Sequence, residues 1–304
     1  MFSKTMSRCA ISVLGFVLVM SLCIGLPGAI AAGFPCDPEI DDGCLYGCTD
    51  DVEFTTEFNL QDCGGFKTKG ANPYLILKPG YRSIYEGVEE GEELEDDDTW
   101  VREEVTVLCD TKWIKLNGRW IKTRVVEERA IECEEDWEEC ETVEISLNWL
   151  AICKRTNAVY YFGEDSRTCD DGFLPGSKTH CVGNVLADDE GSWEAGEDGE
   201  PGLIMPGTPL MGAKYFQEIA PPDAVDRGQV VNVGFDTEDW ENCIEIHDTN
   251  PAEGDCDLGE DVKIYCHGVG QVSDQELELV ESGYVGCDGD DDKRRRHRKY
   301  RSRH

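Results

Sequence analysis

Polar and apolar residues alternate along most of the chain after residue 66, which is the pattern of half-buried β-strands. The clearest example is Lys112–Lys122, where Asn117 and Gly118 supply the two positive-φ positions of a type I′ turn. The sequence therefore predicts a tight hairpin in which two Trp side chains lie opposite Lys side chains. The expected cross-strand pairs are Ile114 with Ile121, Trp113 with Lys122, and Lys115 with Trp120.

A second hairpin is predicted where Arg124–Cys133 and Cys140–Cys153 flank the acidic loop Glu134–Glu139. A disulfide between Cys133 and Cys140 would fix its register, with Ile131 opposite Thr142 and Arg129 opposite Glu144. Further strands are expected at Asn157–Gly163, Ala213–Ile219, Gly228–Phe235, Glu241–His247, Asp261–His267 and Leu277–Val285.

Many strands separated by Gly, Pro and Asp, with almost no helical periodicity, predict a mainly β fold. We expect an antiparallel meander that forms a half-open barrel or a sandwich and is held by disulfides. The chain divides into a signal peptide at 1–31, a Cys-rich acidic segment at 32–65, an antiparallel β domain at 66–287 and a disordered tail at 288–304.

The first thirty residues have the three parts of a secretory signal peptide. Lys4 and Arg8 form a basic start, residues 11–26 are largely apolar, and Ala29-Ile30-Ala31 gives an A-x-A cleavage site. An uncleaved membrane anchor is the alternative, but the apolar run is short for a membrane span. We therefore expect a secreted protein of the extracellular space, the periplasm or the cell envelope.

Cysteine usage indicates the same oxidising location. Removal of Cys9 and Cys23 with the signal peptide leaves fourteen of the sixteen cysteines, an even number. The remaining chain has no C-x-x-C and no H-x-x-x-H spacing, so disulfides are favoured over metal ligation. The pairs that local spacing favours are Cys133–Cys140, Cys243–Cys266 and Cys169–Cys181.

The charge of the chain is extreme, with 64 acidic against 28 basic residues and a net charge of −36. This excess of acids argues against nucleic-acid binding and against docking of the protein body on anionic lipid. The C-terminal tail, in contrast, is positively charged. We expect it to bind an anionic envelope polymer, or to drive self-association by docking on the acidic body of the same or the next molecule. Its basic residues are Lys293, Arg294, Arg295, Arg296, Arg298, Lys299, Arg301 and Arg303.

Runs of acidic residues such as Glu86–Asp98 suggest that the protein could bind calcium. Asp255 and Asp257 begin a D-x-D-x-G sequence that Glu260 and Asp261 follow, which resembles the start of a calcium loop. The alternative is a solvated acidic surface, and it accounts for the other runs equally well. Calcium is the one cofactor that the sequence suggests.

Six short motifs follow one another from residue 72 onward. With these motifs the chain resembles a family of uncharacterised secreted bacterial proteins. The resemblance implies a mostly antiparallel fold similar to half-open barrels that carry lipids or lipoproteins, and it implies no catalytic residues. The many cysteines, the acidity and the basic tail depart from that pattern. The motifs are Asn72-Pro-Tyr-Leu-Ile-Leu-Lys-Pro-Gly80, Tyr160-Tyr-Phe-Gly-Glu-Asp165, Gly191-Ser-Trp-Glu-Ala-Gly196, Pro201-Gly-Leu-Ile-Met-Pro-Gly207, Tyr215-Phe-Gln-Glu218 and Tyr265-Cys-His-Gly-Val-Gly270.

Sequence signatures of common hydrolases, G-x-S-x-G and H-E-x-x-H, do not occur in the chain. We therefore expect a secreted non-catalytic β protein that binds an apolar, lipid-like ligand or assembles through its acidic body and basic tail. One alternative is an acidic extracellular matrix or calcium-binding structural protein. Another is a hydrolase with an unrecognised carboxylate site.

Overall fold

A computed structural model describes residues 54–89, 99–134, 137–169, 172–173, 185–188, 191–221, 224–251, 259 and 261–287. Apart from the short 3-10 helix η1 (Leu60–Cys63), the regular elements in this part of the chain are β-strands. Among these residues no helix could cross a membrane. The expectation of a mainly antiparallel β fold is confirmed.

The strands fall into a short N-terminal set, five long strands in the middle and a C-terminal set. They are β1 (Phe66–Lys67), β2 (Gly70–Ala71), β3 (Ile76–Leu77), β4 (Tyr81–Glu89), β5 (Thr99–Leu116), β6 (Arg119–Glu134), β7 (Glu138–Cys153), β8 (Val159–Cys169), β9 (Val185–Asp188), β10 (Trp193–Glu194), β11 (Gly202–Met205), β12 (Lys214–Phe216), β13 (Arg227–Phe235), β14 (Cys243–Thr249), β15 (Asp261–Cys266), β16 (Gly270–Asp274) and β17 (Leu277–Tyr284).

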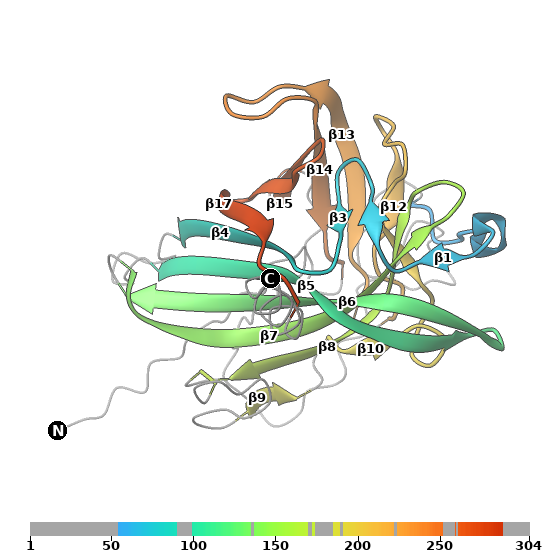
Figure 1. The fold of residues 1–304 in the computed structure, drawn as a ribbon, viewed down its shortest axis with the longest axis horizontal. Coiled ribbons are helices and arrows are strands. Elements are labelled where there is room, and N and C mark those ends of the chain that lie inside the picture. The colour runs from blue at the N-terminus through green and yellow to red at the C-terminus, as the bar shows by residue number, and fades with distance from the viewer. Residues whose placement is uncertain are drawn as a thin grey trace, which may run out of the picture.

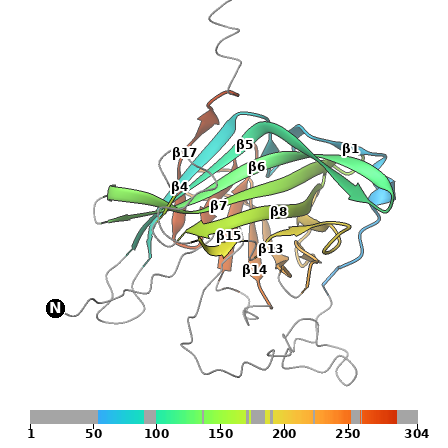
Figure 2. The ribbon, with the colours of Figure 1, turned by 90° about the horizontal axis from the view of Figure 1, so that it is seen from below.

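Most strands belong to one large antiparallel sheet, with the order β10-β8-β7-β6-β5-β4-β17-β16-β15-β14-β13-β12 (Figure 1). Two meanders, β4 to β8 and β12 to β17, are joined by the pairing of β4 with β17. Figure 2 shows β4–β8 arching over β13, β14 and β15. The sheet is a curled, open meander and not a closed barrel.

The two ends of this curled sheet approach each other. After β10 at one end, the backbone N–H of Glu200 donates to the carbonyl oxygen of Ile219, beyond β12 at the other end (2.8 Å). At Gly202, a Cβ atom would lie 1.9 Å from the carbonyl oxygen of Gln217. Only glycine permits that approach, so the inner face of the sheet is enclosed.

The predicted hairpin at 112–122 is present with its expected register. Asn117 and Gly118 have φ values of 49° and 77°, as a type I′ turn requires. Ile114 lies opposite Ile121, and the two Trp–Lys pairs lie opposite each other as predicted. The turn chemistry was therefore sufficient to define this part of β5 and β6.

The register of the second hairpin was predicted only in part. Ile131 lies opposite Thr142 as expected, but Ala130, and not Arg129, lies opposite Glu144. A β-bulge at Val143 of β7 inserts one extra residue there and shifts the pairing by one position. Arg129 instead donates a hydrogen bond to Oε1 of Glu127 (2.8 Å).

Disulfides connect both neighbouring and distant segments. The structure pairs Cys133 with Cys140 and Cys243 with Cys266, the two pairs that the sequence analysis favoured, each with a Cα–Cα distance of 4.0 Å. Cys169 is also disulfide-bonded, and its expected partner Cys181 lies outside the described residues. Two long-range pairs that the sequence did not indicate are Cys63–Cys153 and Cys109–Cys287, which lie 90 and 178 residues apart.

A large apolar core extends from β1, β7, β8 and β11 to buried residues of β13, β14 and β15. Residues 54–66 help to cover it, because Phe58 and Phe66 pack edge-to-face on the ring of Tyr160. Its fully buried members include Leu77, Ile114, Ile152, Val159, Phe162 and Met205. We call this cluster the apolar core.

Candidate functional site

A second group of buried side chains is acidic. It comprises nine buried carboxylates between β5 and β16 that are close enough for their charges to interact, and Lys263 of β15 is buried among them. We call this set the acidic interior. Its carboxylates are Glu103, Glu128, Glu144, Glu164, Glu218, Asp226, Asp248, Asp261 and Asp274.

Strand register explains why these acids share one face. Residues directly opposite each other in an antiparallel pair point to the same side of the sheet. Glu103 lies opposite Ala130, and Ala130 lies opposite Glu144. One row further along, Val105 faces Glu128, which in turn faces Ser146. The polar positions of β5, β6 and β7 therefore form adjacent rows on the inner face.

The curl of the sheet brings acids from its two ends together. Glu164 lies on β8, whereas Glu218 and Asp226 follow and precede β12 and β13 at the opposite end of the strand order. Burial is the main cause of the raised pKa values of Glu164 and Glu218, and the negative charge of Asp226 raises both further. Trp193 of β10 links the two ends by donating its indole N–H to Oε1 of Glu218 (2.8 Å).

Lys263 organises one part of the acidic interior. Its Nζ lies 2.9 Å from Oδ2 of Asp248, 3.4 Å from Oδ2 of Asp261 and 3.9 Å from Oδ2 of Asp274. Burial alone would lower the pKa of Lys263, but attraction to these three carboxylates outweighs it and raises the pKa well above the ordinary value. Lys263 therefore stays charged.

Neutral donors serve other carboxylates of the set. Ser166 donates its hydroxyl to Oε1 of Glu144 (3.0 Å), and Asn148 donates its amide to Oε2 of Glu128 (3.0 Å). The hydroxyl of Tyr161 in turn donates to Oδ1 of Asn148. These bonds hold the side chains of β6, β7 and β8 in one network.

Glu103 differs from its neighbours because neither of its carboxylate oxygens has a hydrogen-bond partner. Its side chain is 1% exposed. Oε1 of Glu128 is likewise without a partner, although its other oxygen is bonded. A buried carboxylate without donors is costly to the fold, so these atoms mark a place where the chain itself does not complete the site.

Burial and repulsion by neighbouring carboxylates raise the pKa of seven of these acids, namely Glu103, Glu128, Glu164, Glu218, Asp226, Asp248 and Asp274. For Glu103, desolvation is the main cause, followed by the negative charge of Asp274. The pKa values of Asp226 and Asp274 rise to about 7, and that of Asp248 to about 6, again mainly through burial. Part of the acidic interior therefore holds protons at neutral pH.

Three of the four predicted calcium ligands lie outside the described residues. Asp255, Asp257 and Glu260 lie outside the described residues, and Asp261 begins β15 beside Lys263. In the part of the chain that the structure describes, no group of three acidic, His or Cys side chains converges as a metal site. The basic tail residues 293–303 also lie outside the described residues.

Sequence analysis missed the acidic interior because it treated acidic residues as a solvated surface. On β7 and β8, Glu144-x-Ser146-x-Asn148 and Glu164-x-Ser166-x-Thr168 place polar residues at every second position. That alternation was visible, but it does not say which face of a strand turns inward. Both faces of β7 are buried from Val143 to Ser146, so polarity gave the wrong expectation.

Comparison with protein-family models, with curated proteins and with solved structures finds no match for this chain. The resemblance to a family of secreted bacterial proteins therefore stays a prediction.

Proposed function

We propose that this is a secreted, non-catalytic binding protein whose acidic interior takes up a cationic ligand. The observation that carries the proposal is Glu103, a buried carboxylate with no donor to either oxygen. Burial and the negative charge of Asp274 disfavour its ionised form, and the attraction of Lys263 offsets this only in part, so its pKa stays well above the ordinary value. A cation beside Glu103 would supply the missing partner and offset this repulsion.

The lining favours a cation over the apolar ligand suggested by the resemblance. An apolar molecule would leave both oxygens of Glu103 and Oε1 of Glu128 without partners and displace any water that solvates them. A ligand with several separated ammonium groups would match acids that are spread over many strands. A polyamine is therefore the class of ligand that we propose, and calcium is the second candidate.

Spermidine and calcium chloride are the two probes for this proposal, used separately on the mature protein at pH 7.5. Thermal unfolding and calorimetric titration should show stabilisation and saturable binding by spermidine. The variant Glu103→Gln should weaken that binding at least tenfold. Glu238→Gln is the matched control, because Glu238 is exposed and undergoes the same chemical change.

The two probes separate the alternatives. If calcium binds, spermidine does not, and Glu103→Gln abolishes calcium binding, the ligand is calcium and not a polyamine. The protein would then have a calcium-dependent structural role. If neither probe binds, or if Glu238→Gln weakens binding as much as Glu103→Gln does, the interior is not a cation site and the proposal is wrong.

We also propose that the basic tail drives association through charge. The support is the opposite sign of the tail and the body, together with the fixed point at which the tail begins. Cys287 is the last described residue and is bonded to Cys109, so the tail starts from an anchored position. If the tail acts through charge, self-association of the protein and its retention on envelope polymer should both weaken as salt rises. Removal of residues 288–304 should abolish both. Unchanged sedimentation and retention after removal would contradict this role.

A further inference from the structure

The acidic excess of the chain is not spread evenly. Three segments, 63–85, 111–126 and 145–163, contain no Asp or Glu at all. The structure joins them at one end of the molecule: β1 pairs with β7, and Nε of Arg124 donates to the carbonyl oxygen of Thr68 (2.8 Å). We call the exposed surface of these segments the basic end.

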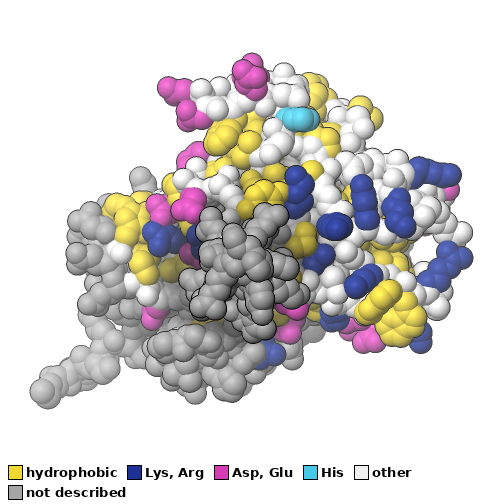
Figure 3. All heavy atoms as spheres, in the orientation of Figure 1, with side chains coloured by type: hydrophobic (Ala, Val, Ile, Leu, Met, Phe, Trp, Pro, Cys, Tyr) yellow, Lys and Arg dark blue, Asp and Glu magenta, His cyan; other side chains and the backbone are white. Residues whose placement is uncertain are grey.

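The basic end carries Lys and Arg side chains in place of the missing acids. In Figure 3 they gather over β1, β3 and the far part of the β5–β6 hairpin. Its exposed bases are Lys69, Lys78, Lys115, Arg119, Lys122, Lys154 and Arg155.

The hairpin adds two exposed aromatic side chains to this charge. Trp113 and Trp120 are 55% and 63% exposed. The register places each opposite a Lys, so Trp113, Lys115, Trp120 and Lys122 form one outward face of alternating ring and cation. Nζ of Lys122 lies 5.6 Å from the ring centroid of Trp113. The inward face of the same hairpin is anchored by Ile114, which is fully buried.

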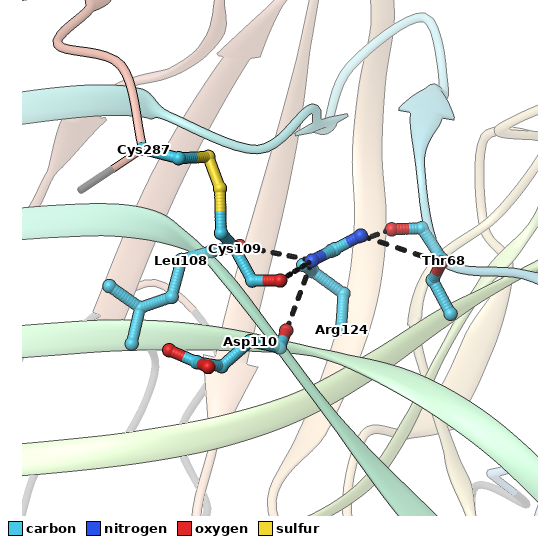
Figure 4. The surroundings of a disulfide bond; sticks show 6 residues. All are labelled: Thr68, Leu108, Cys109, Asp110, Arg124 and Cys287. Carbon is cyan, nitrogen blue, oxygen red and sulfur yellow. Dashed lines mark hydrogen bonds between the residues drawn. A yellow bond between two sulfur atoms is a disulfide. The ribbon is translucent and has the colours of Figure 1, made fainter. Parts of the chain in front are cut away.

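The base of the hairpin is held firmly (Figure 4). Nη1 of Arg124 donates to the carbonyl oxygens of Leu108, Cys109 and Asp110, at 3.2, 2.7 and 3.0 Å. These three carbonyls belong to the irregular stretch of β5 between Val107 and Thr111. The disulfide of Cys109 with Cys287 adds a covalent tie at the same place. The hairpin therefore presents its Trp–Lys face from a fixed base.

We infer that the basic end docks on an anionic lipid bilayer, with Trp113 and Trp120 at the level of the headgroups. Trp side chains are enriched at this depth because their rings are apolar and their N–H groups are polar. The surrounding Lys and Arg side chains would attract anionic headgroups. A soluble anionic polymer would need the same cations but would not need two exposed indole rings.

The net charge of −36 does not prevent this docking. At physiological salt, charges separated by more than about 8 Å in water are largely screened. The bilayer would therefore respond to the acid-free segments that touch it and much less to acids elsewhere. The total charge of the chain predicts repulsion from anionic lipid, whereas the distribution of charge decides the local interaction.

The test uses the mature full-length protein and sedimentation with vesicles of phosphatidylcholine, with and without 30 mol% phosphatidylglycerol. We expect binding to the anionic vesicles that weakens as NaCl rises. Trp113→Ala with Trp120→Ala should weaken it by about tenfold or more, and Lys115→Gln with Lys122→Gln by a similar factor. Gln275→Glu with Ser282→Glu is the matched control, because it changes the net charge equally at exposed sites outside the three segments.

Three results would overturn the inference. The first is equal binding of the double Trp variant and the wild type to anionic vesicles. The second is equal binding to both kinds of vesicle. The third is vesicle binding that disappears on removal of residues 288–304 but survives the Trp and Lys substitutions, which would assign docking to the tail alone. Unchanged thermal unfolding of each variant shows that the fold is intact, and the inference is independent of the cation site.

Discussion

Along β8, the apolar core borders the acidic interior. Phe162 is fully buried in the apolar core, where its ring packs edge-to-face on Phe66 with centroids 5.4 Å apart. The ring of its neighbour Tyr161 belongs to the same core, but its hydroxyl donates to Asn148, which in turn bonds Glu128 of the acidic interior. The two interiors are therefore in direct contact, and burial acts differently on the free energy of folding in each.

An enclosed sheet therefore need not be stabilised throughout its interior. Removal of apolar surface from water in the apolar core favours folding. In the acidic interior, desolvation of Glu103 and its neighbours opposes folding and is offset only partly by Lys263 and by neutral donors. Burial of apolar surface in the apolar core must therefore offset the unfavourable free energy of burying the carboxylates. This arrangement is expected where a protein retains buried charges for binding.

The largest effect should come from the apolar core. Phe162→Ala would leave a cavity and remove aromatic contact, so the free energy of unfolding should fall by about 3–5 kcal/mol. Denaturant titration followed by tryptophan fluorescence measures this change. Val280→Ala, at an exposed position of β17, should change it by less than about 0.5 kcal/mol. If Phe162→Ala lowers the free energy of unfolding no more than Val280→Ala does, Phe162 does not belong to a stabilising core.

Loss of the buried cation should be the next largest effect. Lys263→Met would leave the carboxylates of Asp248, Asp261 and Asp274 without their ion pair, at a cost of about 3 kcal/mol at pH 8. At pH 5 the cost should shrink, because protonated carboxyl groups no longer need the ammonium group. Denaturant titration at the two pH values measures both numbers. An equal cost at pH 5 and pH 8 would show that Lys263 acts through packing alone.

Glu103→Met should act in the opposite direction. The substitution removes a buried carboxylate without donors and retains an unbranched side chain of similar length, so stability should rise by about 1–2 kcal/mol at pH 8. Glu103→Asp keeps the charge and serves as the control, with no gain expected. Destabilisation by Glu103→Met would mean that the carboxylate has a favourable role in the ligand-free fold.

The smallest effect should be a reversed pH trend. Asp226 and Asp274 have folded-state pKa values of about 7, and Asp248 of about 6, whereas unfolded Asp titrates near 4. Between these values the folded state binds more protons, so its stability falls as pH rises through 6 to 7. Acidification from pH 7.5 to pH 7.0 without ligand should therefore raise the free energy of unfolding by about 0.5 kcal/mol, and the melting temperature by about one to two degrees. A flat or falling melting temperature on acidification would contradict the raised pKa values.

Local chemistry predicted more of the fold than of the site. The turn at Asn117-Gly118 and the alternation around it were enough to define a hairpin to the residue. Contacts between residues far apart in the chain could not be predicted from local sequence. Cys63 and Cys153, for example, become neighbours only after the sheet curls. The bulge at Val143 shifts the register by one residue, and no local signal of Gly or Pro marks it.

The site was harder to predict because acidic residues on a β-strand can either face water or line a buried interior. A carboxylate at every second position is typical of a strand with one face in water. Glu144 and Glu164 lie at such alternating polar positions but face inward, because the sheet curls until its two ends approach each other. Curling of this kind is a property of the whole chain, so residues on a single strand could not reveal it.

The pairing of β4 with β17 gives the protein a direction of assembly. A polypeptide is synthesised from its N-terminal end, so β4 to β8 could pair among themselves well before residue 277 is available. During that interval β4 would present an unpaired edge, and such edges recruit other chains. The last strand then covers this edge, and the bond from Cys287 to Cys109 ties it in place. Truncation shortly before β17 should therefore yield a chain prone to aggregation, even though most of its strands are intact.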